Sequence, residues 1–392
     1  MKLHHGRHLA YCTNIHRGET WGEILSALQN HTLAVRDRVG PQKPFAIGLR
    51  LGERAAVELS EPAALLAFQR WLGANDGYVF TINGFPYGRF HGTRVKEKVY
   101  QPDWSSPERL AYTNRLFDLL AQLVPAGIAG SVSTLPGSFK EFQPPPAALK
   151  AIRQNLWRAV EHVARVSEQS GRHLHLGLEP EPLCLLETSA ETIDFFEQLR
   201  AEHPRDARLD AHLGVNYDCC HFAVEFEEPQ TALSALVNHG IKISKIHLSS
   251  ALKVSPTPAA RAALKKFTED VYLHQVVTRD DTGKRSIHRD LPDALNLPPA
   301  TLNVHQSAEW RIHFHVPLHA PAAPPFANTN DHLLGALDWL QARPEVCPHL
   351  EMETYTWEVL PPELKSRSVV DQLAAEYAWT LAELAKRGLA SR

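Results

Sequence analysis

The chain has 392 residues, 44% of them hydrophobic, and is therefore long enough for one large α/β barrel or two ordinary domains. Its 41 Lys and Arg against 44 Asp and Glu give a net charge of −3, which weighs against a nucleic-acid-binding protein. No apolar run approaches the roughly 20 residues of a membrane helix, and the first residues lack the apolar stretch of a secretory signal. With five cysteines and no CxxC spacing, we expect a reduced, cytoplasmic protein that is not membrane-embedded.

Short apolar runs alternate with longer helical patterns along the whole chain. The strands are expected at 9–14, 45–51, 78–84, 130–137, 174–182, 213–221, 243–250 and 349–357. The helices that follow them are expected at 21–39, 62–72, from about 106, 146–170, from 188 or 189, 229–238, 328–342 and 366–388. Ser106 and Pro107 are typical of a helix start, and Gly171 of a helix end. Eight strand-then-helix units imply parallel pairing and predict an α/β fold, a (β/α)8 TIM barrel.

Two connections are too long to be simple loops. Residues 85–105 follow the third strand, and residues 251–327 follow the seventh, with a β-hairpin expected at 272–291. Both come after a strand and before its helix, on the face where barrel enzymes place their active sites. We therefore predict lids or walls of a pocket, with mobile surface loops as the alternative. The expected organisation is one domain over 1–392 with an inserted lid and hairpin region at about 251–327.

Carboxylates are expected at the mouth of the barrel. In residues 173–179 the alternation directs three leucines toward the helices and Glu179 into the barrel mouth. The same alternation directs Glu351 and Glu353 inward, with Glu353 nearer the mouth. Lys245 and Glu351 each lie one step deeper than a mouth residue, and we predict that they approach each other, because neither charge is tolerable alone there.

Two more candidate ligands follow at neighbouring strands. The sixth strand ends in Asp218, with His221 three residues later, and the seventh ends in His247. Together with Glu179 and Glu353 they form a ligand set for a divalent cation: Mn²⁺, Zn²⁺, Fe²⁺, Co²⁺ or Mg²⁺. The individual alternatives are a helix cap for Glu179, a turn residue for Asp218 and a core histidine for His247.

This pattern of strand ends resembles the xylose isomerase-like TIM-barrel superfamily, which includes sugar-phosphate isomerases, epimerases and type-IV apurinic endonucleases. The resemblance implies metal ligands at Glu179, Asp218, His247 and Glu353, and a substrate contact at His221. The segments YCTNIHRGETW, FTINGFPYGRFHG, NYDCCHFAVEFE, EWRIHFHVPL and LEMETYTWEVLP are similar to the metabolite-traffic protein EboE family. That similarity implies partner proteins from the same small operon, and it leaves the reaction open.

Further candidates surround this set. Asn83 falls on the inward face at the barrel mouth, where it would bond a substrate hydroxyl. His313 and His315 share a face of an extended segment, and we interpret them as substrate-binding; an additional zinc site with His221 and a packed histidine face are the alternatives. The neighbouring Cys219 and Cys220 are interpreted as packing behind the site. Neither GxGxxG nor GxxxxGK[ST] occurs, so no nucleotide or organic cofactor is expected.

The function predicted from these residues is that of a metal-dependent isomerase or epimerase acting on a small, polar, sugar-like metabolite. Glu179 and Glu353 are the expected catalytic residues, because they would flank the substrate and move a proton α to a carbonyl. The alternatives are a non-catalytic metabolite-binding or traffic protein of the EboE type and, less favoured, a metal-dependent endonuclease-like phosphodiesterase.

Overall fold

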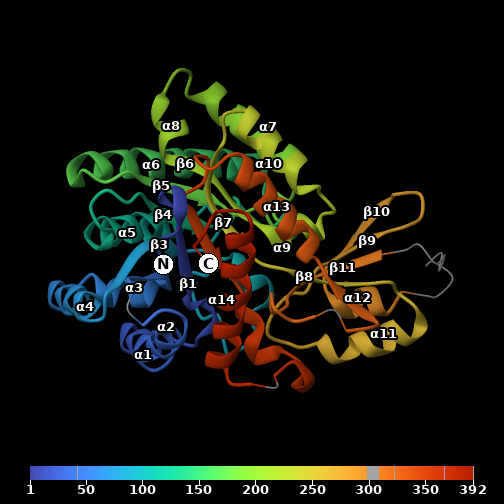
Figure 1. The fold of residues 1–392 in the computed structure, drawn as a ribbon. Coiled ribbons are helices and arrows are strands. Elements are labelled where there is room, and N and C mark those ends of the chain that lie inside the picture. The colour runs from blue at the N-terminus through green and yellow to red at the C-terminus, as the bar shows by residue number, and fades with distance from the viewer. Residues whose placement is uncertain (42, 298–308, 322, 366, 392) are drawn as a thin grey trace.

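A computed structural model describes the chain except for residues 42, 298–308, 322, 366 and 392. Parts of the expected insertion at 251–327 and the first residue of the expected helix at 366–388 thus lie outside the described residues. Eight parallel strands close into a barrel in the order β1-β13-β7-β6-β5-β4-β3-β2 (Figure 1), which confirms the predicted TIM barrel. These strands are β1 (His8–Cys12), β2 (Phe45–Arg50), β3 (Gly77–Asn83), β4 (Gly130–Thr134), β5 (Leu174–Leu178), β6 (Leu213–Asp218), β7 (Lys242–Leu248) and β13 (His349–Met352).

Helices surround the barrel between successive strands (Figure 1). They are α1 (Trp21–Ala27), α2 (Leu33–Val39), α3 (Glu53–Leu59), α4 (Pro62–Ala74), α5 (Pro107–Leu123), α6 (Pro146–Ser170), α7 (Ser189–Glu202), α8 (Ala207–His212), α9 (Cys219–Val224), α10 (Pro229–Asn238), α13 (Asn330–Ala342) and α14 (Val369–Lys386). Ser106 caps α5 by accepting the N–H of Glu108, and Gly171 ends α6 with φ of 65°, both as predicted. Within the described chain, no helix combines the length and apolarity needed to cross a membrane.

A second, five-stranded sheet lies to one side of the barrel (Figure 1), and the chain forms it between β7 and α13. Its strands follow the order β10-β9-β11-β8-β12, and two helices accompany them. These elements are β8 (Ala251–Val254), α11 (Pro258–Leu264), β9 (Val276–Arg279), β10 (Arg285–His288), α12 (Leu291–Leu295), β11 (Glu309–His315) and β12 (Phe326–Asn328). Every second side chain of β11 packs into an apolar core that α11 and α12 share: Trp310, Ile312 and Phe314. Because side chains alternate along a strand, His313 and His315 point to the other face of the sheet.

The interior of the barrel is polar. Leu174, Leu176 and Leu178 of β5 are buried toward the helices, and the intervening His175 hydrogen-bonds Ser244 Oγ at 2.7 Å inside the barrel. One layer higher, Gly48 leaves room for an acidic side chain, because a Cβ on this residue would lie 1.7 Å from Glu351 Oε1. These polar side chains fill successive layers of the barrel interior, and the last layer lies at the carboxyl ends of the strands.

Candidate active site

The four side chains predicted as metal ligands lie together at the carboxyl ends of four neighbouring strands. Glu179 follows β5, Asp218 ends β6, His247 lies on β7 and Glu353 follows β13. Each offers one ligand atom, and the four atoms lie within 4.8 Å of one another. All four side chains are buried, with at most 4% of any residue exposed. The structure therefore brings the whole predicted set to one point.

The imidazole of His247 lies at the centre of this cluster. Its Nδ1 is 3.1 Å from Glu179 Oε1, 3.0 Å from Glu353 Oε2 and 3.3 Å from Asp218 Oδ2. Burial lowers the pKa of His247, but the carboxylates of Glu353 and Glu179 outweigh burial and raise it well above 6.5. Three carboxylates that converge on one nitrogen form a site of strongly negative potential.

The start of α9 holds Asp218 in place. This residue is the N-cap of the helix, and its Oδ1 accepts the N–H groups of Cys220 at 2.8 Å and His221 at 3.1 Å. The hydroxyl of Ser249 donates to the same oxygen at 2.6 Å. The other oxygen, Oδ2, accepts no hydrogen bond from the described residues, and neither does Glu179 Oε2. Buried carboxylate oxygens without donors fit a bound cation. The apolar pattern predicted a strand over 213–221, but residues 219–221 form the first turn of α9 instead.

Two amides fix Glu353. Asn14 Nδ2 donates to Glu353 Oε1 at 2.6 Å, and Asn83 Nδ2 donates to the same oxygen at 3.2 Å. Ser133 Oγ donates to Asn83 Oδ1 at 3.1 Å, which sets the orientation of that amide. Asn83 thus lies at the mouth as expected. Asn14 was missed, although its position at the end of the first expected strand was a usable signal.

A buried ion pair lies directly beneath His247. Lys245 Nζ is 2.5 Å from Glu351 Oε2, which confirms the predicted approach. The same oxygen accepts from His247 Nε2 at 3.0 Å, a contact that the sequence analysis missed. Burial raises the pKa of Glu351, but Lys245 and His247 lower it to about 2. An ionised Glu351 therefore keeps a proton on Nε2 and turns Nδ1 toward the three carboxylates.

A pocket opens above this floor, and both long connections contribute to its walls. Its lining residues are Asn14, Asn83, Phe85, Pro86, Phe90, Val95, Lys96, Val99, Tyr100, Glu179, Glu181, His221, Tyr272, Leu273, His313, Glu353 and Tyr355. The connections also bind each other, because the N–H groups of Val95 and Lys96 both donate to Val271 O at 2.8 Å. Lys96 Nζ donates to Asp290 Oδ2 at 2.6 Å and reinforces this junction.

The three remaining predicted histidines lie beside the floor. His221 and His313 line the pocket, whereas His315 is not among the described lining residues. Two sets of possible ligand atoms occur here: Asp218 with His221 and His315, and Cys220 with His313 and His315. Burial lowers the pKa of His313 well below 6.5, and His221 and His315 lower it further, so this ring is neutral.

Glu181 is a pocket residue that the sequence analysis missed. It is buried, and its Oε1 accepts from Tyr100 Oη at 2.7 Å. Burial raises the pKa of this carboxyl to about 7. The alternation that places Glu179 at the mouth also places residue 181 on the same side, and this signal was available in the sequence.

No protein-family model and no curated protein matches this chain. Among solved structures, L-ribulose 3-epimerase is similar with a TM-score of 0.51 and 13% identity, over 99% of this chain and 96% of that one. A xylose isomerase-like TIM barrel protein from Mycobacterium smegmatis in complex with magnesium is similar with a TM-score of 0.51 and 14% identity, over 99% of both chains. These similarities show a shared TIM-barrel fold.

Proposed function

We propose that this protein is a divalent-metal-dependent isomerase or epimerase of a sugar or a sugar-phosphate-like metabolite. The observation that carries the proposal is the convergence of Glu179 and Glu353 with Asp218 and His247 at the floor of a buried pocket. The fold shared with L-ribulose 3-epimerase supports a sugar as the substrate class.

The cation would be held by Glu179, Asp218, His247 and Glu353. Together with Glu351, this buried region contains four carboxylates, which exceed the positive charges of Lys245 and His247, and a divalent cation would compensate the excess negative charge. The mixed oxygen and nitrogen donors suit Mn²⁺, Zn²⁺, Fe²⁺, Co²⁺ or Mg²⁺. When bound, the cation supplies Lewis-acid polarisation of a substrate carbonyl or hydroxyl oxygen.

The two glutamates supply the proton transfer. Glu179 removes the proton from the carbon next to the carbonyl, and the electron pair of the broken C–H bond moves toward the carbonyl oxygen. Glu353, which comes from another strand of the barrel, would take a proton from solvent and deliver it to the opposite face of that carbon or to the neighbouring carbon, and Glu179 would return the proton it removed to solvent. The first outcome is epimerisation and the second is aldose–ketose isomerisation. Asn14 and Asn83 hold Glu353 Oε1, so the carboxylate keeps one orientation throughout.

The pocket above the floor fits a small polar molecule. Phe85, Phe90 and Tyr272 form apolar walls, and His221 supplies a polar contact beside the two glutamates. His221 Nδ1 donates to Pro180 O at 2.9 Å, which leaves Nε2 for a polar contact with a substrate hydroxyl. Apolar walls with a few fixed polar groups are typical of small-molecule sites.

Solvent exchange tests the proposal. The metal-loaded protein would be incubated in D₂O with a panel of ketoses and ketose phosphates, and deuterium on the carbons next to the carbonyl would be followed by NMR. We expect exchange with at least one sugar and a loss of roughly 10²–10⁴-fold in rate in Glu179→Gln and Glu353→Gln. Glu61→Gln, at an exposed glutamate before α4, is the control and should exchange like the wild type.

Two other outcomes would redirect the proposal. Saturable binding of a sugar without exchange in any metal form would refute catalysis and favour a metabolite-binding or traffic protein of the EboE type. Cleavage of DNA at abasic sites by the metal-loaded protein would instead favour the phosphodiesterase alternative.

A further inference from the structure

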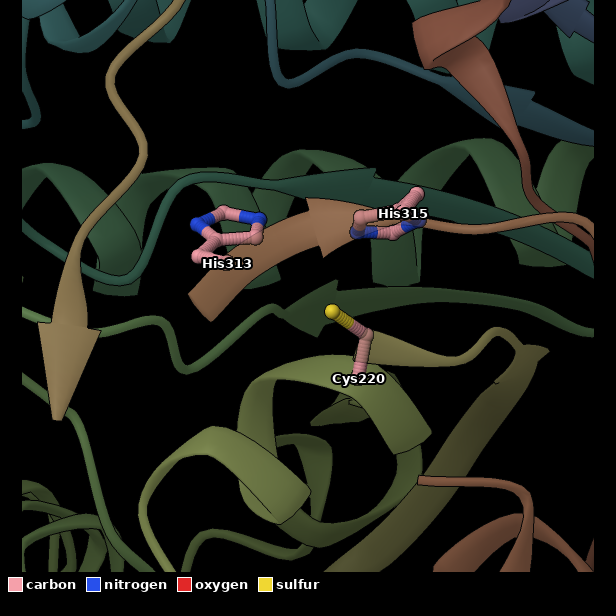
Figure 2. Close-up of side chains that lie close together, drawn as sticks. All are labelled: Cys220, His313 and His315. Carbon is pink, nitrogen blue, oxygen red and sulfur yellow. The ribbon is translucent and has the colours of Figure 1, made fainter. Parts of the chain in front are cut away.

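We infer that Cys220, His313 and His315 form a second cation site, beside the four-residue site and distinct from it in chemistry. Each of the three residues offers one ligand atom, and the three atoms lie within 4.8 Å of one another. Figure 2 shows the sulfur of Cys220 pointing from the start of α9 toward the two imidazoles on β11. All three residues are buried.

The hydrogen bonds around His313 leave one ring nitrogen free to bind a metal. Gln275 Nε2 donates to Pro182 O at 3.1 Å, so the amide oxygen of Gln275 faces His313 Nδ1 at 2.8 Å. An amide oxygen only accepts, and Nδ1 must therefore carry the proton. The lone pair remains on Nε2, which has no hydrogen-bond partner within the described chain.

His315 is fixed in the same tautomer by a different partner. Its Nδ1 lies 3.0 Å from the backbone oxygen of Glu353, which again only accepts. Its Nε2 is buried and also lacks a partner among the residues that the structure describes. Both buried imidazoles thus donate Nδ1–H to an oxygen and keep an unprotonated Nε2 without a partner among the described residues. Metal-binding histidines in proteins are oriented in the same way.

Cys220 is brought to these rings by the barrel and by the inserted sheet. Its N–H donates to Asp218 Oδ1 and to Ser249 Oγ, both at 2.8 Å, which fixes the first turn of α9. Arg311 on β11 donates to Ala223 O at 2.6 Å and joins the strand to the same helix. The site would therefore fasten the inserted sheet to the barrel.

The donor set selects Zn²⁺. One thiolate and two imidazoles are softer ligands than the three carboxylates and one imidazole of the neighbouring site. Tetrahedral zinc with these ligands needs donor separations of about 3.3–3.6 Å, so the side chains must close by no more than about 1.5 Å. Three protein ligands would leave a fourth position open, and one of the three, His313, also lines the pocket.

Metal counting on the full-length protein tests the inference. Protein stripped with a chelator and dialysed against Zn²⁺ should retain two ions per chain, whereas Mn²⁺ should fill only the carboxylate site. Cys220→Ala and His313→Ala should each lose one zinc, with an affinity loss greater than the roughly 10–100-fold typical of an outer-shell change. Cys219→Ala, at the adjacent buried cysteine, is the matched control and should keep both ions.

The wild-type protein gives a readout that does not depend on any variant folding. Co²⁺ bound at this site should show the near-ultraviolet charge-transfer band of a cobalt–thiolate bond, and Cys220→Ser should remove it. Absence of the band, or undiminished zinc in Cys220→Ala, would overturn the inference. Loss of zinc in His221→Ala but not in Cys220→Ala would assign the ion to Asp218, His221 and His315 instead. If the carboxylate site fails to bind, the wild type should still retain one zinc that depends on Cys220.

Discussion

Replacing Lys245 with methionine should destabilise the barrel strongly. The ammonium lies 2.5 Å from Glu351 Oε2, and the side chains of the pair are 1% and 0% exposed. Met is of similar length and apolar, so the substitution removes the charge while it largely fills the space. The buried carboxylate of Glu351 then keeps only His247 as a partner on that oxygen. Loss of one partner of a buried ion pair costs about 3–5 kcal/mol.

This magnitude converts into a measurable shift in melting temperature. For 392 residues, an unfolding entropy of roughly 2.1 cal/mol/K per residue amounts to about 0.8 kcal/mol/K. The expected loss therefore lowers Tm by about 4–6 °C in calorimetry, with a matching shift in a urea titration. Lys386→Met is the control, because Lys386 Nζ also lies 2.5 Å from a glutamate but the lysine side chain is 67% exposed. That change should cost under about 1 kcal/mol.

The double variant Lys245→Met/Glu351→Gln separates charge from packing. With both charges gone, most of the lost stability should return, because a neutral buried pair has no uncompensated charge. The reasoning fails if Lys245→Met melts within 1 °C of the Lys386→Met control, or if the double variant is as unstable as the sum of its single changes.

Three further outcomes follow from the same structure. Gly48→Ala should lower the free energy of unfolding by at least about 1–3 kcal/mol in urea titrations, because the new Cβ would collide with Glu351. Gly22→Ala in α1 is the control: there is open space around its Cβ, so the change should be neutral or stabilising by up to about 1 kcal/mol. Burial raises the pKa of Glu376 to about 8 from 4.5. The folded protein therefore holds a proton that the unfolded chain releases between these pH values, and the free energy of unfolding falls by about 1.4 kcal/mol per pH unit as pH rises. Glu376→Gln should flatten this dependence of stability on pH between pH 5.5 and 7.5. Mn²⁺ at about 100 times its Kd should stabilise the protein by about 2.7 kcal/mol, and Asp218→Asn should abolish this gain in thermal melts.

The fold was accessible from sequence because period-two and period-3.6 patterns report which faces are buried. The strand expected at 174–182 is observed as Leu174–Leu178, and the helix expected at 146–170 is observed with those bounds. The expected strands ran too far at their carboxyl ends, where residues leave the sheet and turn toward the pocket. The strand expected at 213–221 shows why: Asp218 caps a helix there, and its neighbours Cys219 and Cys220 are apolar enough to extend a strand pattern.

The site was predictable only where one strand's alternation determined a side chain's direction. Glu179 and Glu353 needed no knowledge of other strands, and their positions follow from period two. The positions of Asn14 and Glu181 near strand ends could be read from the sequence, but their partners are distant in sequence, so local patterns do not carry their roles. Cys220 was interpreted as packing, because nothing in the sequence shows that β11 returns to cover the start of α9.

The orientation of the proposed metal ligand His247 depends on side chains that lie one layer deeper in the barrel than the four proposed ligands. Glu351 accepts from both His247 and Lys245, so the charge of Lys245 keeps Glu351 ionised, and the ionised Glu351 sets the ring of His247. Gly48 is part of the same arrangement, because only a residue without Cβ leaves space for the carboxylate of Glu351. A substitution at Lys245 or at Gly48, neither of which is a proposed metal ligand, should therefore weaken cation binding by roughly 10–100-fold. Such a loss, measured in a variant that remains folded, would separate orientation of His247 from simple loss of stability.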